Sequence, residues 1–344
     1  MSEPLHRPDG GPGDGRAANI FDVARLAGVS HQTVSRVIND LTGVRPSTKA
    51  RVEQAIAQLR YSPSPAARAL VTKRSRTIGL ITPAVADYGP TSIAMHFNLA
   101  ARVARYVVES VSTPADDPKA VRAVIDGLLR QRVDAIVLVV VDVEVLEMAR
   151  SLDLRIPIVI AGSASRRSPG LVGFDQYRGA RAAVRHLAEL GHTRVLHLAG
   201  QRNAPDASER VRGWRDELAE HRLEIPTPVF GDWSAASGYK LGIDLDIAPG
   251  DAVFVSNDQM TIGLLSALRE RGLSVPGDIS IVGFDDVPEA AYLYPPLTTV
   301  RQEFAQLGEL MMQKLLIAIE ESEPVTQDTP LPTQLVVRQS TRTI

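Results

Sequence analysis

The chain has 344 residues, no cysteine and a formal net charge of −2, from 38 Lys or Arg and 40 Asp or Glu. The lack of cysteine excludes disulfides, thiolate catalysis and cysteine-bound metals, and the seven histidines show no ligand spacing. No apolar run reaches the roughly 20 residues that a membrane helix needs. Residues 1–18 are rich in Gly and Pro, contain no apolar signal segment and are expected to be disordered. We therefore expect a cytoplasmic protein of two or three domains, without a metal or cofactor.

The segment from Asn19 to Asp40 predicts two short helices joined by a tight turn. Asn19 is a good N-cap, Asp22 suits the positive end of a helix, and Gly28 supplies the backbone freedom that a turn needs. The second helix has an apolar face and an opposite face that carries His31, Gln32, Ser35 and Arg36. Such a stripe can read base edges in a DNA major groove. The stripe alone would also fit a solvated amphipathic helix, but the turn and the spacing together favour a helix-turn-helix.

The residues that follow agree with a DNA-binding head. A third helix is expected from Pro46 to Leu59, and Ser64 and Pro65 can begin a short helix that is too short to be stable alone. Residues 19–74 contain nine Lys or Arg and three acidic residues, a net charge of +6, so the remainder of the chain is acidic. A basic head on an acidic body indicates a nucleic-acid-binding module joined to a body with another task.

The body from about Arg76 alternates apolar runs with helical patterns, which predicts buried parallel sheet in an α/β architecture. Candidate strands are Thr77–Thr82, Ala135–Val141, Pro157–Ala161, Leu171–Phe174, Arg194–Ala199, Ala252–Ser256, Ile279–Phe284 and Gln334–Arg338. Candidate helices are Thr91–Arg105, Pro118–Gln131, Tyr177–Leu190, Ala207–Glu220, Ser234–Asp244, Asp258–Arg271 and Phe304–Ile319. These units are too many for one small sheet, so we expect two lobes with a ligand cleft at the strand ends.

Motifs for chemistry are mostly missing from this body. It contains neither a P-loop nor a nucleophile elbow. Polar and aromatic residues stand instead at the predicted strand ends: Arg210, Trp233, Asn257, Asp285, Gln302 and Phe304. Such residues can bind the hydroxyls and the apolar face of a sugar ring. Structural roles are also open, because Asn257 and Asp258 could cap a helix and Trp233 could belong to a core.

Several segments resemble the LacI/GalR family of bacterial repressors: GVSHQTVSRVIND, YSPSPAARAL, GDWSAASGY, SNDQM and PGDISIVGFDDVPEAAYLYPPLTTVRQEFAQLG. The resemblance covers roughly residues 19–341. It implies a helix-turn-helix domain at 19–62, a hinge helix and linker at 63–75, and a two-lobed core like periplasmic sugar-binding proteins at 76–341. The implied first lobe comprises about 76–174 and 303–332, and the second about 175–302 and 333–341. The fold class expected is thus α/β with an all-α head.

The resemblance also implies functional residues. Those matching DNA-binding positions are His31, Gln32, Thr33, Ser35, Arg36, Thr48, Ala67 and Leu70. Leu70 matches the leucine that wedges into a minor-groove step and kinks the DNA. Those matching effector-binding positions are Ile93, Arg210, Trp233, Asn257, Asp285, Gln302 and Phe304, with Pro90 beside them. Two departures bear on the ligand: Gly162 stands where a sugar-binding member has an aspartate, and Asp87 where it has an apolar residue.

The function implied is a transcriptional repressor that binds a pseudo-palindromic operator as a homodimer and responds to a small carbohydrate. A dimer is expected because the C-terminal heptad helix of tetrameric members is absent. One alternative is a repressor activated by a purine-like co-repressor, which Asp285 and Trp233 disfavour for charged ligands. A non-DNA sugar-binding protein would need an export signal. An enzyme would need an acid/base pair, which this sequence does not supply, so no enzymatic activity is expected.

Overall fold

The computed structural model describes residues 18–38, 42–61, 74–163, 170–321, 325 and 329–344. The chain divides into two compact units, Met1–Ser75 and Arg76–Ile344, which are described separately below. The expected tail at 1–18 and hinge helix at 63–75 lie almost entirely outside the described residues, and so do Ala67 and Leu70. Their predicted roles stay predictions.

The first unit contains three short helices, α1 (Ile20–Ala27), α2 (His31–Ile38) and α3 (Pro46–Gln58). The predicted N-cap of α1 is confirmed: Asn19 Oδ1 accepts from the Phe21 amide at 2.8 Å, and Asp22 Oδ2 accepts from the Asn19 amide at 2.9 Å. The turn after α1 needs Gly28, because its backbone is left-handed at φ 62°. Burial then fixes the angle between the helices, since Val23, Val34 and Val52 are fully buried against one another's neighbours.

The second unit begins with a five-stranded sheet in the order β2-β1-β3-β4-β5, in which every neighbouring pair is parallel. Its strands are β1 (Thr77–Pro83), β2 (Val107–Thr113), β3 (Ala135–Val139), β4 (Ile158–Ala161) and β5 (Leu171–Val172). Side chains alternate between its faces: Ile78 and Leu80 belong to one apolar cluster and Ile81 to another. Both faces are therefore covered by helices, as parallel sheets require.

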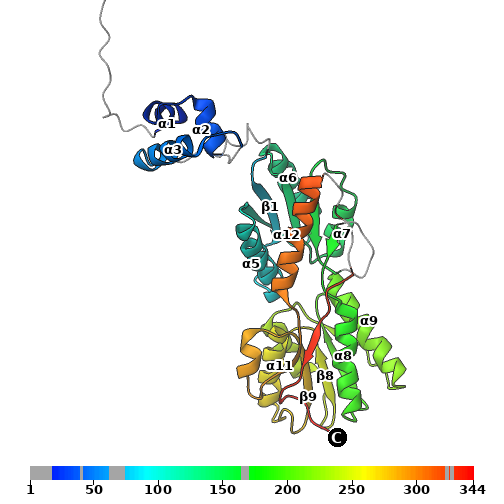
Figure 1. Ribbon diagram of the computed structural model, residues 1–344. Coiled ribbons are helices and arrows are strands. Elements are labelled where there is room, and N and C mark those ends of the chain that lie inside the picture. The colour runs from blue at the N-terminus through cyan, green and yellow to red at the C-terminus, as the bar shows by residue number, and fades with distance from the viewer. Residues whose placement is uncertain (1–17, 39–41, 62–73, 164–169, 322–324, 326–328) are drawn as a thin grey trace, which may run out of the picture. The chain divides into compact units, whose positions relative to one another are not determined.

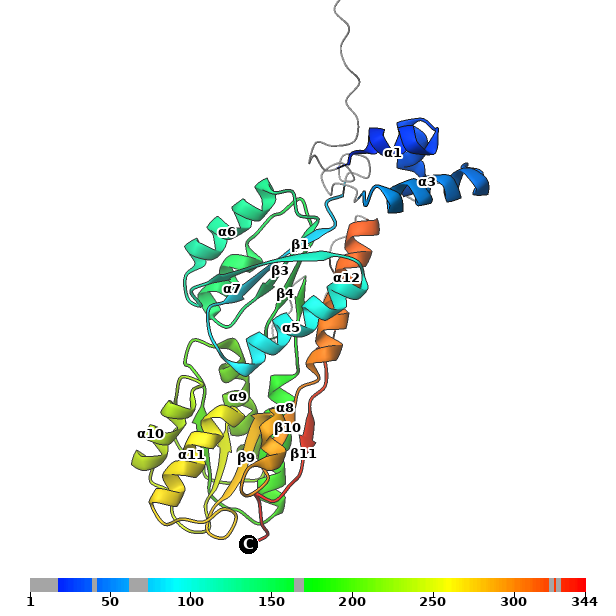
Figure 2. The same cartoon turned by 90° about the vertical axis from the view of Figure 1, so that its left-hand side faces the viewer.

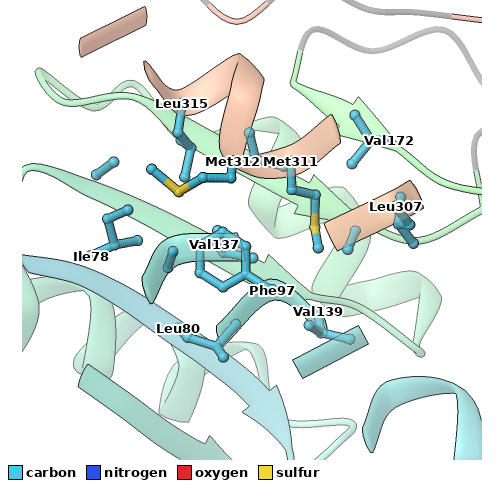
Figure 3. Packing of buried hydrophobic residues seen from close by; sticks show 14 of the residues in the cluster. Ile78, Leu80, Phe97, Val137, Val139, Val172, Leu307, Met311, Met312 and Leu315 are labelled. Atoms are coloured by element: carbon cyan, nitrogen blue, oxygen red, sulfur yellow. The ribbon is translucent and has the colours of Figure 1, made fainter. Parts of the chain in front are cut away.

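One face of this sheet carries α5 (Tyr88–Val103) and α12 (Phe304–Glu321), and the other carries α6 (Pro118–Arg130) and α7 (Val143–Arg150). The two views in Figures 1 and 2 show α5 and α12 on the same side of the sheet. Figure 3 shows Phe97 of α5 packed among Leu80, Val137 and Met311. The segment 304–321, which follows the last parallel strand of the other sheet in sequence, is thus part of the first core.

The second sheet has six strands in the order β11-β10-β9-β8-β6-β7, all parallel except for the antiparallel pair β10 and β11. Its strands are β6 (Val195–Ala199), β7 (Val229–Phe230), β8 (Ala252–Val255), β9 (Ser280–Asp285), β10 (Thr298–Arg301) and β11 (Gln334–Val336). Its flanking helices are α8 (Gln176–Glu189), α9 (Pro205–Glu220), α10 (Ala235–Asp244) and α11 (Asp258–Glu270), with a short 3-10 helix at Pro288–Tyr292. The apolar cluster under α8 and α9 lies apart from the one under α11.

The chain passes between the two sheets more than once. It enters the second sheet after β5, returns to the first through α12, and then adds β11 to the second. Where the last segment crosses, Phe174 and Leu331 form an isolated parallel bridge. Several chain crossings place residues that are distant in sequence at the junction of the sheets.

The α/β fold class with parallel sheets is confirmed, and every long element expected from the sequence is present within one to three residues of its expected ends. Three elements were not expected: β2, α7 and β10. Strand β2 lies at the sheet edge and keeps only Thr113 buried, so its sequence lacks the apolar run of a central strand. The predicted strand Leu171–Phe174 is shorter, ending at Val172.

Candidate functional sites

Helix α2 places most of its predicted DNA-reading side chains at the surface of the first unit. His31, Gln32 and Arg36 are exposed, while Thr33 and Ser35 are half-buried. His31 packs its ring 5.2 Å from that of Phe21 on α1, and Arg36 Nη2 donates to the Thr42 carbonyl at 2.9 Å. These contacts fix the directions in which the two side chains leave the helix.

Two of the predicted DNA-binding residues also serve the local fold. The Thr33 amide donates to Ser30 Oγ at 3.2 Å, and the two hydroxyls lie 3.0 Å apart, so Ser30 caps α2 as the sequence predicted. Thr48 lies half-buried in the first turn of α3, where its amide donates to the Arg45 carbonyl at 3.0 Å. Backbone amides at a helix start are well suited to a phosphate oxygen.

The second unit contains a cavity of about 700 Å³ of empty space, part of it open to solvent, where the two sheets meet. All seven predicted effector-binding residues line it: Ile93, Arg210, Trp233, Asn257, Asp285, Gln302 and Phe304. Pro90, Asp87 and Gly162 line it as well. The carboxyl ends of β4, β8, β9 and β10 all meet here, which is where parallel sheets bind ligands. The fold thus brings together residues from segments spread over more than 200 positions of the sequence.

A continuous hydrogen-bond network forms the polar wall of this cavity. Arg210 Nε donates to Gln176 Oε1 at 3.0 Å, and the Arg210 guanidinium also donates to the Ser256 carbonyl. Gln176 Nε2 donates in turn to Gln302 Oε1 at 2.9 Å, and Gln302 Nε2 donates to Asp285 Oδ1 at 2.7 Å. Because each amide is held at both ends, the wall presents its remaining polar atoms in fixed positions.

Asp285 is the most strongly perturbed carboxyl of the wall. Burial raises its pKa to about 7, although the Arg210 guanidinium, 3.7 Å away, favours the charged form. Its backbone lies at φ 107°, a conformation that side-chain-bearing residues rarely adopt. Strain of this kind persists where the surroundings hold it, and it is often found at binding sites.

Trp233 forms another side of the cavity and is also at positive φ, 75°. Its ring lies directly over Gly200: a Cβ added there would come within 2.1 Å of the indole Cη2. Asn257 fixes the same loop, because its Nδ2 donates to the Trp233 carbonyl at 3.0 Å while its Oδ1 caps α11 through the Met260 amide at 2.9 Å. The helix-capping role and a place in the cavity, which the sequence left as alternatives, are therefore both found for Asn257.

The opposite side of the cavity is apolar. Phe304 packs edge-on against Tyr88 and Phe174, with ring centroids 5.6 and 5.3 Å apart, and Ile93 packs beside them. A cavity with one hydrogen-bonding wall and one aromatic wall matches a ligand that has polar edges and apolar faces.

The sequence did not identify several residues that line this cavity. The polar ones are Gln176 and Asp206, and the apolar or aromatic ones are Tyr88, Gly89, Phe174, Ala204 and residues 139–141. Gln176 and Asp206 lie in the first turns of α8 and α9. A polar residue at a helix start ordinarily suggests a cap, so no sequence signal separated these two from capping residues. Asp258, by contrast, does not line the cavity: it is buried, accepting from Thr299 Oγ1 at 2.6 Å and the Val287 amide at 2.9 Å.

A helical head of helix-turn-helix type and a two-lobed α/β core with a ligand cavity define the class of ligand-responsive DNA-binding regulators. Comparison with family models agrees for both parts. Residues 19–64 match the model for bacterial regulatory proteins of the lacI family, and residues 184–341 match that for periplasmic binding protein-like domains. The chain belongs to the LacI family of DNA-binding transcriptional repressors.

Individual relatives are similar over nearly the whole chain. The lactose operon repressor of Escherichia coli K12 is 33% identical over 331 residues, covering 95% of this chain and 91% of the relative. The HTH-type transcriptional repressor PurR of Haemophilus influenzae PittEE is 32% identical over 346 residues, covering 95% and 99%. Among solved structures, the lac repressor dimer bound to operator and the anti-inducer ONPF superposes with a TM-score of 0.85 at 32% identity, covering 95% of this chain and all of that chain. None of the helices in the described residues is long and apolar enough to cross a membrane.

Proposed function

We propose that this protein is a repressor that binds a pseudo-palindromic operator as a homodimer and leaves it when a small carbohydrate enters the cavity between the lobes. One observation carries the choice of ligand. The cavity sets the Arg210–Gln176–Gln302–Asp285 network opposite the Phe304 ring, and a sugar has both hydroxyls for the network and an apolar ring face for the aromatic wall. The similar lactose operon repressor supports the same ligand class.

The proposed operator contact is made by α2 in the major groove. Arg36 suits the O6 and N7 atoms of guanine, and Gln32 can pair with adenine. Two heads related by a two-fold axis would read two half-sites, as in the operator-bound dimer of the similar lac repressor. Because this task requires access to the chromosome, we place the protein in the cytoplasm.

The proposed switch is a change in the relative orientation of the lobes. Ligand-binding residues come from both lobes, Ile93 from the first and Asp285 from the second, so a bound sugar favours one orientation over the other. Only such differential affinity can move an equilibrium. The first lobe begins at Thr77, directly after the proposed hinge at 63–75, so its rotation would reach the DNA-binding heads.

The experiment that tests this function measures release from DNA. An operator is first selected from random duplexes, and mono- and disaccharides are screened for stabilisation of the protein in thermal unfolding, since a ligand of the native state raises the melting temperature. We expect a stabilising sugar to release the operator in fluorescence anisotropy. Asp285→Ala should keep operator affinity and lose release, while Asp244→Ala, an exposed residue at the end of α10, should behave like the wild type.

Two outcomes would contradict the proposal. Release of Asp285→Ala at the wild-type sugar concentration would mean that the effector binds elsewhere. Tighter operator binding with ligand, above all with a purine base, would show the co-repressor mode that was the alternative from the sequence.

A further inference from the structure

One carboxylate oxygen in the cavity has no partner in the network described above. Asp206 belongs to the first turn of α9 and lines the cavity; its Oδ2 accepts from Gln176 Nε2 at 3.2 Å. Its Oδ1 is buried and makes no hydrogen bond within the described part of the chain. A buried carboxylate oxygen without a donor is costly, and native proteins rarely leave one so.

The groups around Asp206 do not remove this deficit. Burial raises the pKa of its carboxyl, and the Arg210 guanidinium only partly offsets the rise. The hydroxyl of Ser163, which follows β4 in the other lobe, also favours the charged form but lies outside hydrogen-bond geometry, and its Oγ is likewise buried without a partner among the described residues. Two unsatisfied polar atoms, one from each lobe, thus face the same end of the cavity.

The donors nearest to Asp206 are already in use. Gln176 Nε2 divides its two hydrogens between Asp206 Oδ2 and Gln302 Oε1, and Arg210 directs its Nε to Gln176 and Nη1 to Ser256. The protein therefore presents more acceptors than donors at this wall. Three carboxyls line the cavity (Asp87, Asp206 and Asp285) against the single guanidinium of Arg210.

We infer that Asp206 is a specificity-determining ligand contact: its Oδ1 accepts a hydrogen bond from a donor group of the bound sugar, and its charge rejects acidic sugars such as uronates and sugar phosphates. The inference rests on the proposed sugar-binding function and assigns a residue to it. The donor is a ring hydroxyl or an ammonium group, since both donate and neither is anionic. Gly162 leaves the space next to this wall open, because it has no side chain to enter it.

The test compares matched sugars on matched variants of the full-length protein. Affinities for glucose and galactose, and for glucuronate and galacturonate, are measured by calorimetry on the wild type, Asp206→Asn and Asp216→Asn. The control residue Asp216 lies on the same helix and accepts from the Tyr177 hydroxyl at 3.0 Å outside the cavity. We expect the wild type to prefer a neutral sugar over its uronate by at least about tenfold, as unpaired like charges in a cavity require. Asp206→Asn should lose most of that preference, and Asp216→Asn should keep it.

The outcomes separate this inference from the function on which it rests. If the wild type binds a neutral sugar and Asp206→Asn keeps both the affinity and the preference, the inference alone is wrong. If no sugar binds the wild type, the proposed sugar control fails and the inference fails with it. A comparison with glucosamine and galactosamine identifies the donor: tighter amino-sugar binding that Asp206→Asn abolishes indicates an ammonium group, and equal or weaker binding indicates a hydroxyl.

Discussion

The contact between Gly200 and Trp233 allows a sharp test of the cavity, because a single methyl group should displace one wall without removing any ligand-binding side chain. In Gly200→Ala the new Cβ would lie 2.1 Å from the indole Cη2, whereas ordinary contact begins at 3.4 Å. The ring must therefore move by 3.4 minus 2.1, or about 1.3 Å. A misfit of this size in an apolar contact costs about 1–3 kcal/mol, so the proposed sugar should bind roughly 10- to 100-fold more weakly.

The assay is sugar-dependent release of a fluorescent operator, with the sugar identified by thermal shift. Gly200→Ala should bind the operator as the wild type does and require roughly 10- to 100-fold more sugar for half-release. Gly89→Ala is the matched control, because Gly89 also lines the cavity but a Cβ there would meet nothing within 4 Å. Half-release of Gly200→Ala at the wild-type sugar concentration would refute the assignment of Trp233 to the ligand site.

Three further predictions concern the head, the charge state of the cavity and the first core. Arg36→Ala should weaken operator binding by about 1–3 kcal/mol and relax one half-site position, which equal binding of all duplexes by both proteins would contradict. Since the pKa of Asp285 is about 7, its carboxyl is mostly neutral at pH 6 and ionised at pH 8, so calorimetry should find sugar affinity about tenfold higher at pH 8, and a flat profile would exclude ionised Asp285 as the acceptor. Phe97→Ala, at a fully buried position, should lower the free energy of unfolding of the core by about 3–5 kcal/mol in urea titrations; an unchanged midpoint would mean that the cavity collapses without cost.

How far the sequence reached differs between the head and the core. In the head, the caps and the turn are local: Asn19, Asp22, Gly28 and Ser30 act on backbone groups within three or four residues, so their order in the sequence was sufficient. The long strands and helices of the core were predictable for a related reason. A strand buried on both faces must be apolar throughout, as β3 is, and that run is visible without a partner.

Tertiary structure decided what lies beside what. Strand β2 is half-exposed at a sheet edge, so pairing with β1 rather than composition makes it a strand. The same holds for the cavity. Gln176 and Asp206 appear in the sequence as helix-start polar residues, and only the meeting of α8, α9 and the turn before α12 turns them into one wall with Gln302.

The resemblance of motifs identified seven cavity residues by position, but it could not supply their bonds. Whether an oxygen such as Asp206 Oδ1 is satisfied depends on donors brought from distant segments of the chain, with the nearest one at Gln176, thirty residues earlier. Local order along the chain determined the elements and the DNA-reading helix. Long-range packing determined the hydrogen-bond balance of the cavity, because that balance is a sum over groups that are neighbours only in the folded state.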